Sequence, residues 1–340
     1  MKVLILNNLP NESGIGRYAH ILYDSLYPRS ELINFPSKTD LSTGSFSGTV
    51  LKPSTNSKVI NALARPIVQR KIIKYIDSYP GIVHYAGHSM YPLGKHSAKN
   101  RIGTIHDLIP LENFDGLLST LYYRRNIRAM LDIPNIIVLT EIMKKKLTLE
   151  HHYSGRVFVV PYGYANVFNT TYSKENLIPF KREADKHYIL SVSTDQPRKN
   201  LKILPPVMKM LDQSYRLVRI GPPVPGSITF DHVSSAQSVG IYRSCDVMIF
   251  PSLDEGFGIP MIEAFASALP VAASDIPVFR EIGGDAVEFF DPNKPEEAAE
   301  AVRRIMSNRE KYKGKSFERA KLYSPELLAE RMRKIYDSLF

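Results

Sequence analysis

Short apolar, β-branched runs alternate with amphipathic stretches along almost all of the 340 residues. Strands buried on both faces form continuous apolar runs of this kind, and the helices that connect parallel strands are amphipathic. We therefore expect α/β domains with parallel sheets. The predicted strands lie near 2–6, 31–35, 82–85, 101–105, 135–139 and 157–160 in the first half, and near 188–193, 215–220, 247–250, 270–273 and 287–290 in the second.

The length of the chain and two polar segments indicate two domains. A chain of this length has room for two domains of about 100–200 residues, each with its own core. The polar segment 36–58 is expected to be a mobile loop, and 164–186 is the best candidate for the linker. No run approaches the ~18–20 apolar residues of a membrane span. The single cysteine, Cys245, excludes an intrachain disulfide, so a cytoplasmic protein is the simplest interpretation.

The most informative motif contains two carboxylates, Glu255 and Glu263, on either side of a Gly-Phe-Gly turn. The turn follows the strand predicted at 247–250, and Pro260 marks the start of a helix. Unpaired N–H groups and the helix dipole attract anions at such a point. Acids beside an anion site suggest a ligand with hydroxyls and phosphates, such as a nucleotide sugar. Two surface glutamates are the alternative, which the glycine turn between them disfavours.

Residues 245–265 resemble the signature of the retaining glycosyltransferases of family 4, which have the GT-B fold. The likeness covers nearly the whole chain, because four further motifs precede this one and occur in the same order as in the family. They are Ser13-Gly-Ile-Gly-Arg-Tyr18, Thr104-Ile-His-Asp-Leu-Ile-Pro110, Val159-Val-Pro-Tyr-Gly163 and Asp195-Gln-Pro-Arg-Lys-Asn200.

This resemblance implies a GT-B fold of two Rossmann-like domains whose parallel sheets face a central cleft. The N-terminal domain, 1–165, would form the acceptor side, and the C-terminal domain, 166–324, would bind the nucleotide-sugar donor. The last segment, 325–340, would be a helix that crosses back to the N-terminal domain. Its start suits Ser324 as N-cap and Pro325 as first helical residue.

In the N-terminal domain the resemblance selects Gly14 and Gly16 as donor-binding residues. They lie between a predicted strand and a helix predicted from Arg17, where glycines let the backbone approach phosphate oxygens. A plain strand-to-helix turn is the alternative. Because Ala19 stands where a dinucleotide motif has its third glycine, NAD is not expected.

His106 follows the strand predicted at 101–105, so it lies at a carboxyl end where ligands gather in α/β sheets. An imidazole can hydrogen-bond a sugar hydroxyl, and by similarity this one approaches the transferred sugar as a catalytic residue. The alternative is a structural histidine bonded to a loop carbonyl.

In the C-terminal domain, Arg198 and Lys199 follow the strand predicted at 188–193 and would neutralise the diphosphate leaving group. An exposed basic pair in a loop is the alternative. Some family members carry another arginine five residues before the counterpart of Arg198, where this chain has Ser193. The resemblance therefore implies that fewer cations contact the diphosphate here, and that Lys199 contributes more of the positive charge.

By similarity, Glu263 bonds the ribose hydroxyls of the nucleotide, and Glu255 lies nearer the donor sugar as the catalytic carboxylate. Whether Glu255 stabilises an oxocarbenium-like transition state or attacks covalently stays open. The backbone N–H groups of Phe257, Gly258 and Ile259 would bind sugar hydroxyls or the β-phosphate.

Two absences bear on this interpretation. The chain has no Asp-x-Asp triplet, which metal-dependent glycosyltransferases commonly use, and no His/Cys/carboxylate cluster with metal-ligand spacing. A metal-independent enzyme without a cofactor is therefore expected. The family often has Cys-Gly or Ser-Gly after the Glu263 helix, and this chain has Ser267-Ala268, so an altered turn is expected there.

Positive charge is concentrated in the first half of the chain. Residues 1–165 hold 20 Lys/Arg and 11 Asp/Glu, net +9, whereas residues 166–340 hold 24 and 23, net +1. Nucleic acid, a phosphorylated acceptor or peripheral docking on anionic lipid headgroups could each explain this. The alternatives are mere solubility and ordinary helices with a solvated basic face. The basic segments are 65–76, 117–131 and 144–146.

The expected function is retaining transfer of a mannose- or glucose-type hexose from a nucleoside-diphosphate sugar to a hydroxyl of a glycan or lipid-linked acceptor. The enzyme would act in the cytoplasm, at the inner face of the membrane if docking occurs. No nucleic-acid partner is expected, since the chain has no Trp and no motif that reads DNA or RNA. The alternatives are a GT-B nucleotide-sugar epimerase and a non-catalytic protein that binds nucleotide sugars or polyanions.

Overall fold

The computed structural model describes residues 2–7, 9, 14–26, 28–34, 70–71, 73–88, 93–109, 117–169 and 180–339. The loop expected at 36–58 lies outside them, as does 170–179 of the expected linker. The chain forms two compact units, one made of residues 1–163 and 325–340 and the other of residues 164–324.

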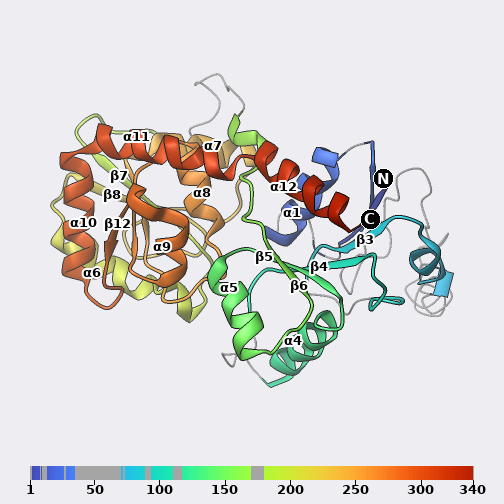
Figure 1. Cartoon of the computed structure of the whole chain (residues 1–340). Helices are drawn as coiled ribbons and strands as arrows, with labels where there is room; N and C mark the ends of the chain where they lie inside the picture. The colour runs from blue at the N-terminus through green and yellow to red at the C-terminus, as the bar shows by residue number, and fades with distance from the viewer. Residues whose placement is uncertain are drawn as a thin grey trace, which may run out of the picture. The chain divides into compact units, whose positions relative to one another are not determined.

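The N-terminal unit contains a six-stranded parallel sheet in the order β2-β1-β3-β4-β5-β6 (Figure 1). Every residue of β1, β3, β4 and β5 is buried, as the continuous apolar runs predicted. The strands are β1 (Val3–Asn7), β2 (Ser30–Asn34), β3 (Ile82–Tyr85), β4 (Arg101–Ile105), β5 (Asn135–Val138) and β6 (Arg156–Val159). Each lies within one residue of its predicted position.

The helices of this unit are α1 (Gly14–Leu26), α4 (Leu117–Met130) and α5 (Glu141–Lys145), followed by a π-helical turn (Lys146–Glu150). Residues 70–71 and 73–78 are also helical. The Oγ1 atom of Thr140 caps α5 by accepting a hydrogen bond from the Met143 N–H at 3.1 Å. Helix α1 begins at Gly14, so the prediction that it starts at Arg17 was three residues late.

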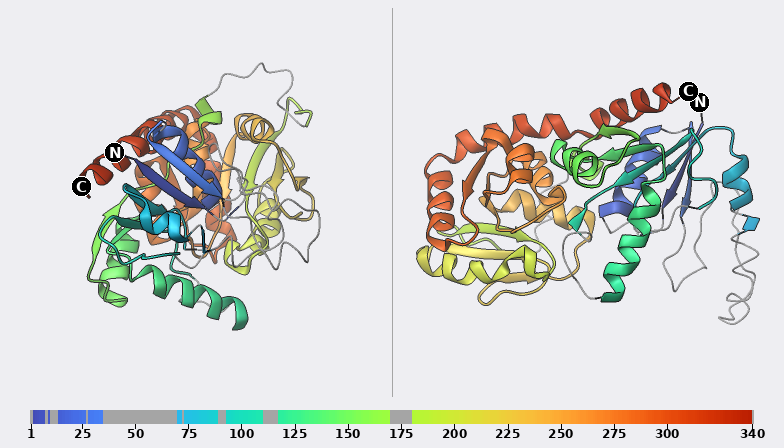
Figure 2. Two further views of the ribbon diagram at one scale, coloured as in Figure 1. Left: turned by 90° about the vertical axis from the view of Figure 1, so that its right-hand side faces the viewer. Right: turned by 60° about the horizontal axis from the view of Figure 1, so that its bottom comes forward.

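The last helix, α12 (Pro325–Ser338), belongs to the N-terminal unit and packs against α1. In Figures 1 and 2 the red α12 lies beside the blue α1, and both ends of the chain lie in this unit. Tyr336 of α12 is fully buried, and its hydroxyl lies 2.6 Å from Nδ1 of His84 on β3. The other ring nitrogen of His84 lies 2.7 Å from Oγ1 of Thr104, which also bonds the Tyr18 hydroxyl. This buried network fastens α12 to the sheet.

The C-terminal unit contains a second parallel six-stranded sheet, in the order β12-β11-β10-β7-β8-β9. Its strands are β7 (His187–Val192), β8 (Tyr215–Ile220), β9 (Ile228–Phe230), β10 (Val247–Phe250), β11 (Val271–Ser274) and β12 (Val287–Phe290). The sequence analysis missed β9, a three-residue edge strand too short to show a periodic pattern.

Six helices lie between these parallel strands or follow the last of them among the described residues. They are α6 (Leu204–Met210), α7 (Ser235–Ser244), α8 (Ile259–Ala266), α9 (Pro277–Gly283), α10 (Pro295–Ser307) and α11 (Arg309–Ala320). Helix α10 buries its alanine-rich face against β10, β11 and β12, and α6 packs against β8 and α10. Because each sheet is covered by helices and buries its strands, the polar groups that can meet a ligand lie at the strand ends. No helix among the described residues is long and apolar enough to cross a membrane.

Candidate active site

The C-terminal sheet reverses its strand order between β7 and β10. The chain runs from β7 outward to β8 and β9, and then returns to place β10 on the other side of β7. In open α/β sheets, ligands bind outside the carboxyl ends of the strands at such a reversal. The short helical turn Pro197–Lys199 follows β7, and the motif with Glu255 follows β10. The Leu253 N–H donates to the Arg198 carbonyl at 2.7 Å and ties the two loops together.

Three of the predicted site residues meet at this point. Lys199 Nζ lies 2.6 Å from Oε1 of Glu255, and Arg198 Nη1 lies 3.2 Å from its Oε2. The Ser252 hydroxyl donates to Oε1 at 2.8 Å. The Glu255 side chain is only 7 % exposed, against 26 % for Arg198 and 14 % for Lys199.

This cluster carries a net positive charge, because two cations share one carboxylate. A largely buried carboxylate needs such partners, since burial without them would disfavour its charged form. The cations keep their remaining N–H groups for other acceptors, and charge-assisted bonds of this kind suit phosphate oxygens. The arrangement can therefore hold an anionic group next to a carboxylate.

The Gly-Phe-Gly turn leads into α8 as the motif predicted. Gly258 caps the helix with φ = 99°, a backbone conformation that favours glycine. A Cβ atom on it would lie 3.0 Å from the Phe279 ring and 3.3 Å from the Phe250 ring. The N–H groups of Gly258 and Ile259 have no acceptor among the described residues. Phe257 is itself buried, with its ring 6.1 Å from that of Tyr323.

Glu263 lies in the second turn of α8 and is 4 % exposed. Its Oε2 accepts a hydrogen bond from the Tyr242 hydroxyl of α7 at 2.8 Å. The structure thus separates the two glutamates of the motif. Glu255 is paired with cations, and Glu263 is bonded to a phenol.

The turn after α8 keeps the geometry of a glycine-containing turn, although Ala268 stands in it. The Leu269 N–H donates to the Ala264 carbonyl at 2.8 Å, and the Ala268 N–H donates to the Phe265 carbonyl at 2.9 Å. These two bonds define a Schellman motif, whose C′ residue has a positive φ. Ala268 has φ = 51°. The expectation of an altered turn was therefore wrong, because the alanine accepts the strained conformation.

In the N-terminal unit, the other predicted residues lie beside a second reversal of strand order, between β1 and β3. Gly14 and Gly16 occupy the first turn of α1. A Cβ atom on Gly87, in the loop after β3, would lie 2.7 Å from Ile15 and 3.5 Å from Nε2 of His106. The glycine segment and His106 are thus brought together across Gly87.

His106 is buried and bonded at both ring nitrogens. Nε2 lies 2.6 Å from the Ala86 carbonyl, which can only accept, so Nδ1 accepts from the Tyr162 hydroxyl. The imidazole also stacks on the Tyr162 ring, with 5.5 Å between centroids. Burial lowers the pKa of His106 to about 3, so the ring is neutral. The bond to a loop carbonyl matches the structural alternative, and contact with a sugar stays a prediction that requires one of these bonds to open.

One polar residue at the carboxyl edge of the C-terminal sheet was missed by the sequence analysis. Arg219 on β8 is fully buried, and its guanidinium bonds both oxygens of Ser193, at the end of β7. The signal was present as an arginine inside the otherwise apolar run Leu217-Val-Arg-Ile220. An apolar run alone, however, does not tell which neighbour an interrupting charge meets.

Most of the C-terminal unit also matches a known protein family. Residues 173–316 match the model of the family described as glycosyl transferases group 1. The C-terminal unit is a group 1 glycosyltransferase domain. The group 1 domain contains the Arg198, Lys199 and Glu255 cluster, together with Glu263.

The whole chain also resembles characterised proteins. It is 25 % identical over 224 residues to the O-antigen chain mannosyltransferase RfbU of Salmonella typhimurium, and the match covers 61 % of each chain. The aligned part thus spans about three fifths of that relative's length. Sucrose-phosphate synthase from Thermosynechococcus elongatus superposes with a TM-score of 0.74 at 16 % identity, covering 100 % of this chain and 99 % of the other. Anabaena HepE, solved in complex with UDP-glucose, superposes with a TM-score of 0.69 at 12 % identity, covering 99 % and 100 %. These likenesses establish the GT-B fold around the group 1 domain.

Proposed function

We propose that this protein transfers a mannose- or glucose-type hexose from a nucleoside-diphosphate sugar to a hydroxyl of a glycan or lipid-linked acceptor, with retention of configuration. The observation that carries the proposal is the pairing of Glu255 with Lys199 and Arg198 at the strand-order reversal of the group 1 domain. In the proposed reaction, the carboxylate would face the sugar and the two cations beside it would bind the leaving diphosphate.

Each residue has a distinct part in the proposed reaction. Arg198 and Lys199 stabilise the negative charge that develops on the leaving diphosphate. The N–H groups at the start of α8 add partial positive charge to the same site. Glu255 faces the sugar, and Glu263 accepts bonds from the ribose hydroxyls. No metal ion is required, since the two cations and the helix N-terminus supply the positive charge.

Two of the similar proteins suggest which hexoses to test as the transferred sugar. RfbU is an O-antigen mannosyltransferase, and HepE was solved with UDP-glucose. The first test is a thermal-shift screen against GDP, UDP, ADP and TDP and their common sugars, with and without EDTA. A rise in Tm with one nucleotide that survives EDTA supports a metal-independent transferase and identifies the base of its donor. No rise with any of them contradicts the proposal.

Two further measurements separate the proposal from its alternatives. Proton NMR of the product should show the α-anomer when an α-linked donor is used, and a β-product would exclude retention. Formation of a free epimerised nucleotide sugar without an acceptor would favour an epimerase instead. Binding to heparin at physiological salt, without affinity for nucleotides, would favour a polyanion-binding protein.

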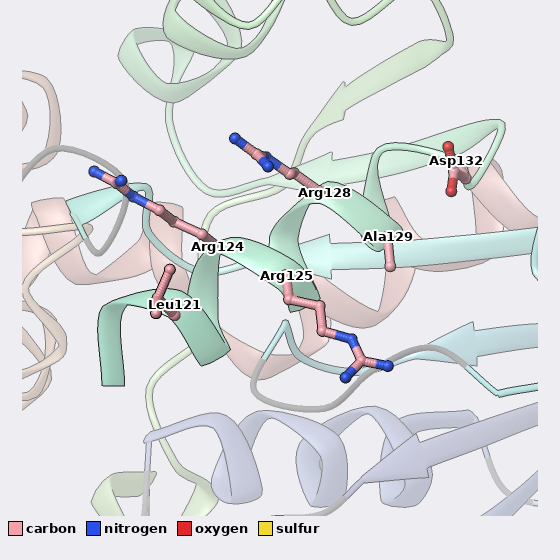
Figure 3. Close-up of a pocket in the computed structure, with 6 residues that line it drawn as sticks. All are labelled: Leu121, Arg124, Arg125, Arg128, Ala129 and Asp132. Atoms are coloured by element: carbon pink, nitrogen blue, oxygen red, sulfur yellow. The ribbon is translucent and has the colours of Figure 1, made fainter. Parts of the chain in front are cut away.

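The N-terminal unit is proposed to dock peripherally on anionic membrane, where a lipid-linked acceptor would be reached. On α4, a hollow is lined by Leu121, Arg124, Arg125, Arg128, Ala129 and Asp132. Figure 3 shows Arg124 and Arg128 extending from one side of the helix and Arg125 from another. Leu121 is 53 % exposed next to these cations, which is a combination that suits the boundary between headgroups and acyl chains. Of the segment 65–76, the described cations Arg70, Lys71 and Lys74 are also exposed.

Liposome flotation at low salt tests this docking. Each basic residue near an anionic surface contributes about 1 kcal/mol, so Arg125→Glu should weaken binding to phosphatidylserine vesicles by roughly tenfold or more. The charge-matched control Lys311→Glu, on an exposed position of α11, should leave binding unchanged. Absence of wild-type protein from the floated fraction would refute docking.

A further inference from the structure

A buried arginine at the carboxyl edge of the C-terminal sheet has only neutral partners. Arg219 is 0 % exposed on β8. Its Nε lies 3.3 Å from the Pro222 carbonyl, Nη1 lies 2.9 Å from Oγ of Ser191, and Nη2 lies 3.0 Å from the Ser193 carbonyl. No carboxylate in the described part of the chain pairs with it. Burial lowers its pKa to about 10, so the guanidinium stays charged at neutral pH.

Burying a cation without a counter-ion costs folding free energy. Such a cation is therefore a candidate for stabilising a ligand or a side chain that binds one. The surrounding backbone is shaped around this group. Gly221 has φ = 118°, and a Cβ atom there would lie 2.1 Å from the Ser193 carbonyl oxygen and 3.3 Å from Nη2 of Arg219. Only glycine allows β8 to end so close to the end of β7 and to leave the guanidinium its place.

Ser193 connects this cation with the sheet edge. Its Oγ lies 3.4 Å from both Nη1 and Nη2 of Arg219. A guanidinium can only donate, so the serine oxygen must accept, and its own proton points elsewhere. That proton has no acceptor among the described residues, and Ser193 is partly exposed. The loop that follows Ser193 leads directly to Arg198 and Lys199.

We propose that Ser193 donates a hydrogen bond to the diphosphate of the nucleotide sugar, and that Arg219 is the positioning residue that turns and polarises its hydroxyl. The chain thereby brings a positive charge from β8 to the end of β7. This inference rests on the proposed function and identifies two further residues of the same site.

The proposed bond from Ser193 to the diphosphate predicts specific changes in nucleotide affinity. A hydrogen bond to a charged group contributes enough that Ser193→Ala should weaken binding of UDP or GDP, whichever the wild type prefers, by about 5- to 30-fold. Binding of the uncharged nucleoside should not change, since it has no diphosphate. Ser193→Thr keeps the hydroxyl and should restore affinity. The control Ser316→Ala removes a buried hydroxyl of α11 that bonds the Leu269 carbonyl, and should leave affinity unchanged.

Arg219→Gln tests the positioning role, because glutamine keeps N–H donors and loses the charge. It should lower the ratio of diphosphate to nucleoside affinity, whereas a purely structural defect would weaken both ligands alike. Combined with Ser193→Ala, it should cost no more than the larger single effect, since both act on one bond. If Arg219→Gln does not fold, the Ser193 pair of variants still decides the proposal.

Isothermal titration gives the diphosphate affinities, and ligand-observed NMR gives those for the nucleosides. Unchanged diphosphate affinity in Ser193→Ala would overturn the proposed roles of Ser193 and Arg219 and leave the transferase proposal intact. A wild-type protein that binds neither UDP nor GDP would overturn both.

Discussion

Lys199 Nζ lies 2.6 Å from Oε1 of Glu255, so the cation proposed for the donor's diphosphate and the carboxylate proposed for catalysis are bonded to each other. Arg198 shares the same carboxylate at 3.2 Å. A diphosphate that binds these cations must compete with Glu255. We therefore expect donor binding to be coupled to release of the carboxylate towards the sugar.

Glu255→Gln should lower the rate of hexose transfer by at least about 100-fold, because the charge that faces the reacting sugar is lost. Affinity for the nucleoside diphosphate should stay equal or rise, because no carboxylate competes for the cations. Mass spectrometry of the product and calorimetry with UDP or GDP measure the two effects separately. The control Glu318→Gln, at an exposed position paired with Lys321, should change neither. A parallel loss of rate and affinity would show that Glu255 acts in binding.

Glu263→Ala should weaken nucleotide binding by about tenfold or more, because the ribose hydroxyls lose a charged acceptor. The variant also removes the hydrogen bond between the Tyr242 hydroxyl and Glu263. Tyr242→Phe therefore serves as the matched control, since it removes that bond and keeps the carboxylate. Calorimetry should show near-normal affinity for Tyr242→Phe. Equal losses in both variants would mean that Glu263 supports the fold rather than the ribose.

Ala268→Gly should raise the free energy of unfolding by about 0.5–1 kcal/mol. Alanine at φ = 51° is strained, whereas glycine adopts this conformation freely, although glycine gives back part of the gain through the entropy of the unfolded chain. Ala266→Gly, at the last residue of α8, is the opposite control and should destabilise, since glycine there loses entropy on folding and relieves no strain. Urea denaturation compares the three proteins. A lower midpoint for Ala268→Gly would disprove the strain.

The N-terminal unit should lose stability in mild acid. Burial lowers the pKa values of His84 and His106 to about 3, below the ordinary value of 6.5. Between these pH values the unfolded chain binds more protons than the folded one, so stability is fully present above pH 6.5 and falls as the pH drops towards 3. Each histidine contributes a slope of up to about 1.4 kcal/mol per pH unit.

Urea midpoints measured from pH 7.5 to 4.5 test this slope. His84→Asn should flatten it only in part, because burial also lowers the pKa values of His88 and His20 in the same unit. It should also lower stability at neutral pH, because the bonds to Tyr336 and Thr104 are weakened. The exposed His232→Asn should leave the slope unchanged. If the stability of the wild-type protein does not vary over this pH range, the buried histidines do not have lowered pKa values.

Much of the architecture could be predicted because its signals are local. The apolar runs predicted eleven of the twelve strands, and only β9 was too short to show a pattern. Pro325 marked the first residue of α12, since proline suits that position. Alanine at position 268 misled the prediction, because the two hydrogen bonds of the turn are decided by how α8 joins β11 and not by the residue type alone.

The sequence by itself determined the two α/β sheets and the motif around Glu255 and Glu263, because strand periodicity, glycine turns and helix starts depend on neighbours in the chain. Only the tertiary structure decided that Lys199 bonds Glu255, that Arg219 bonds Ser193 and that Tyr336 bonds His84. The partners in these pairs lie from 26 to 252 positions apart. They meet only through strand order, register and helix packing, which no local pattern specifies.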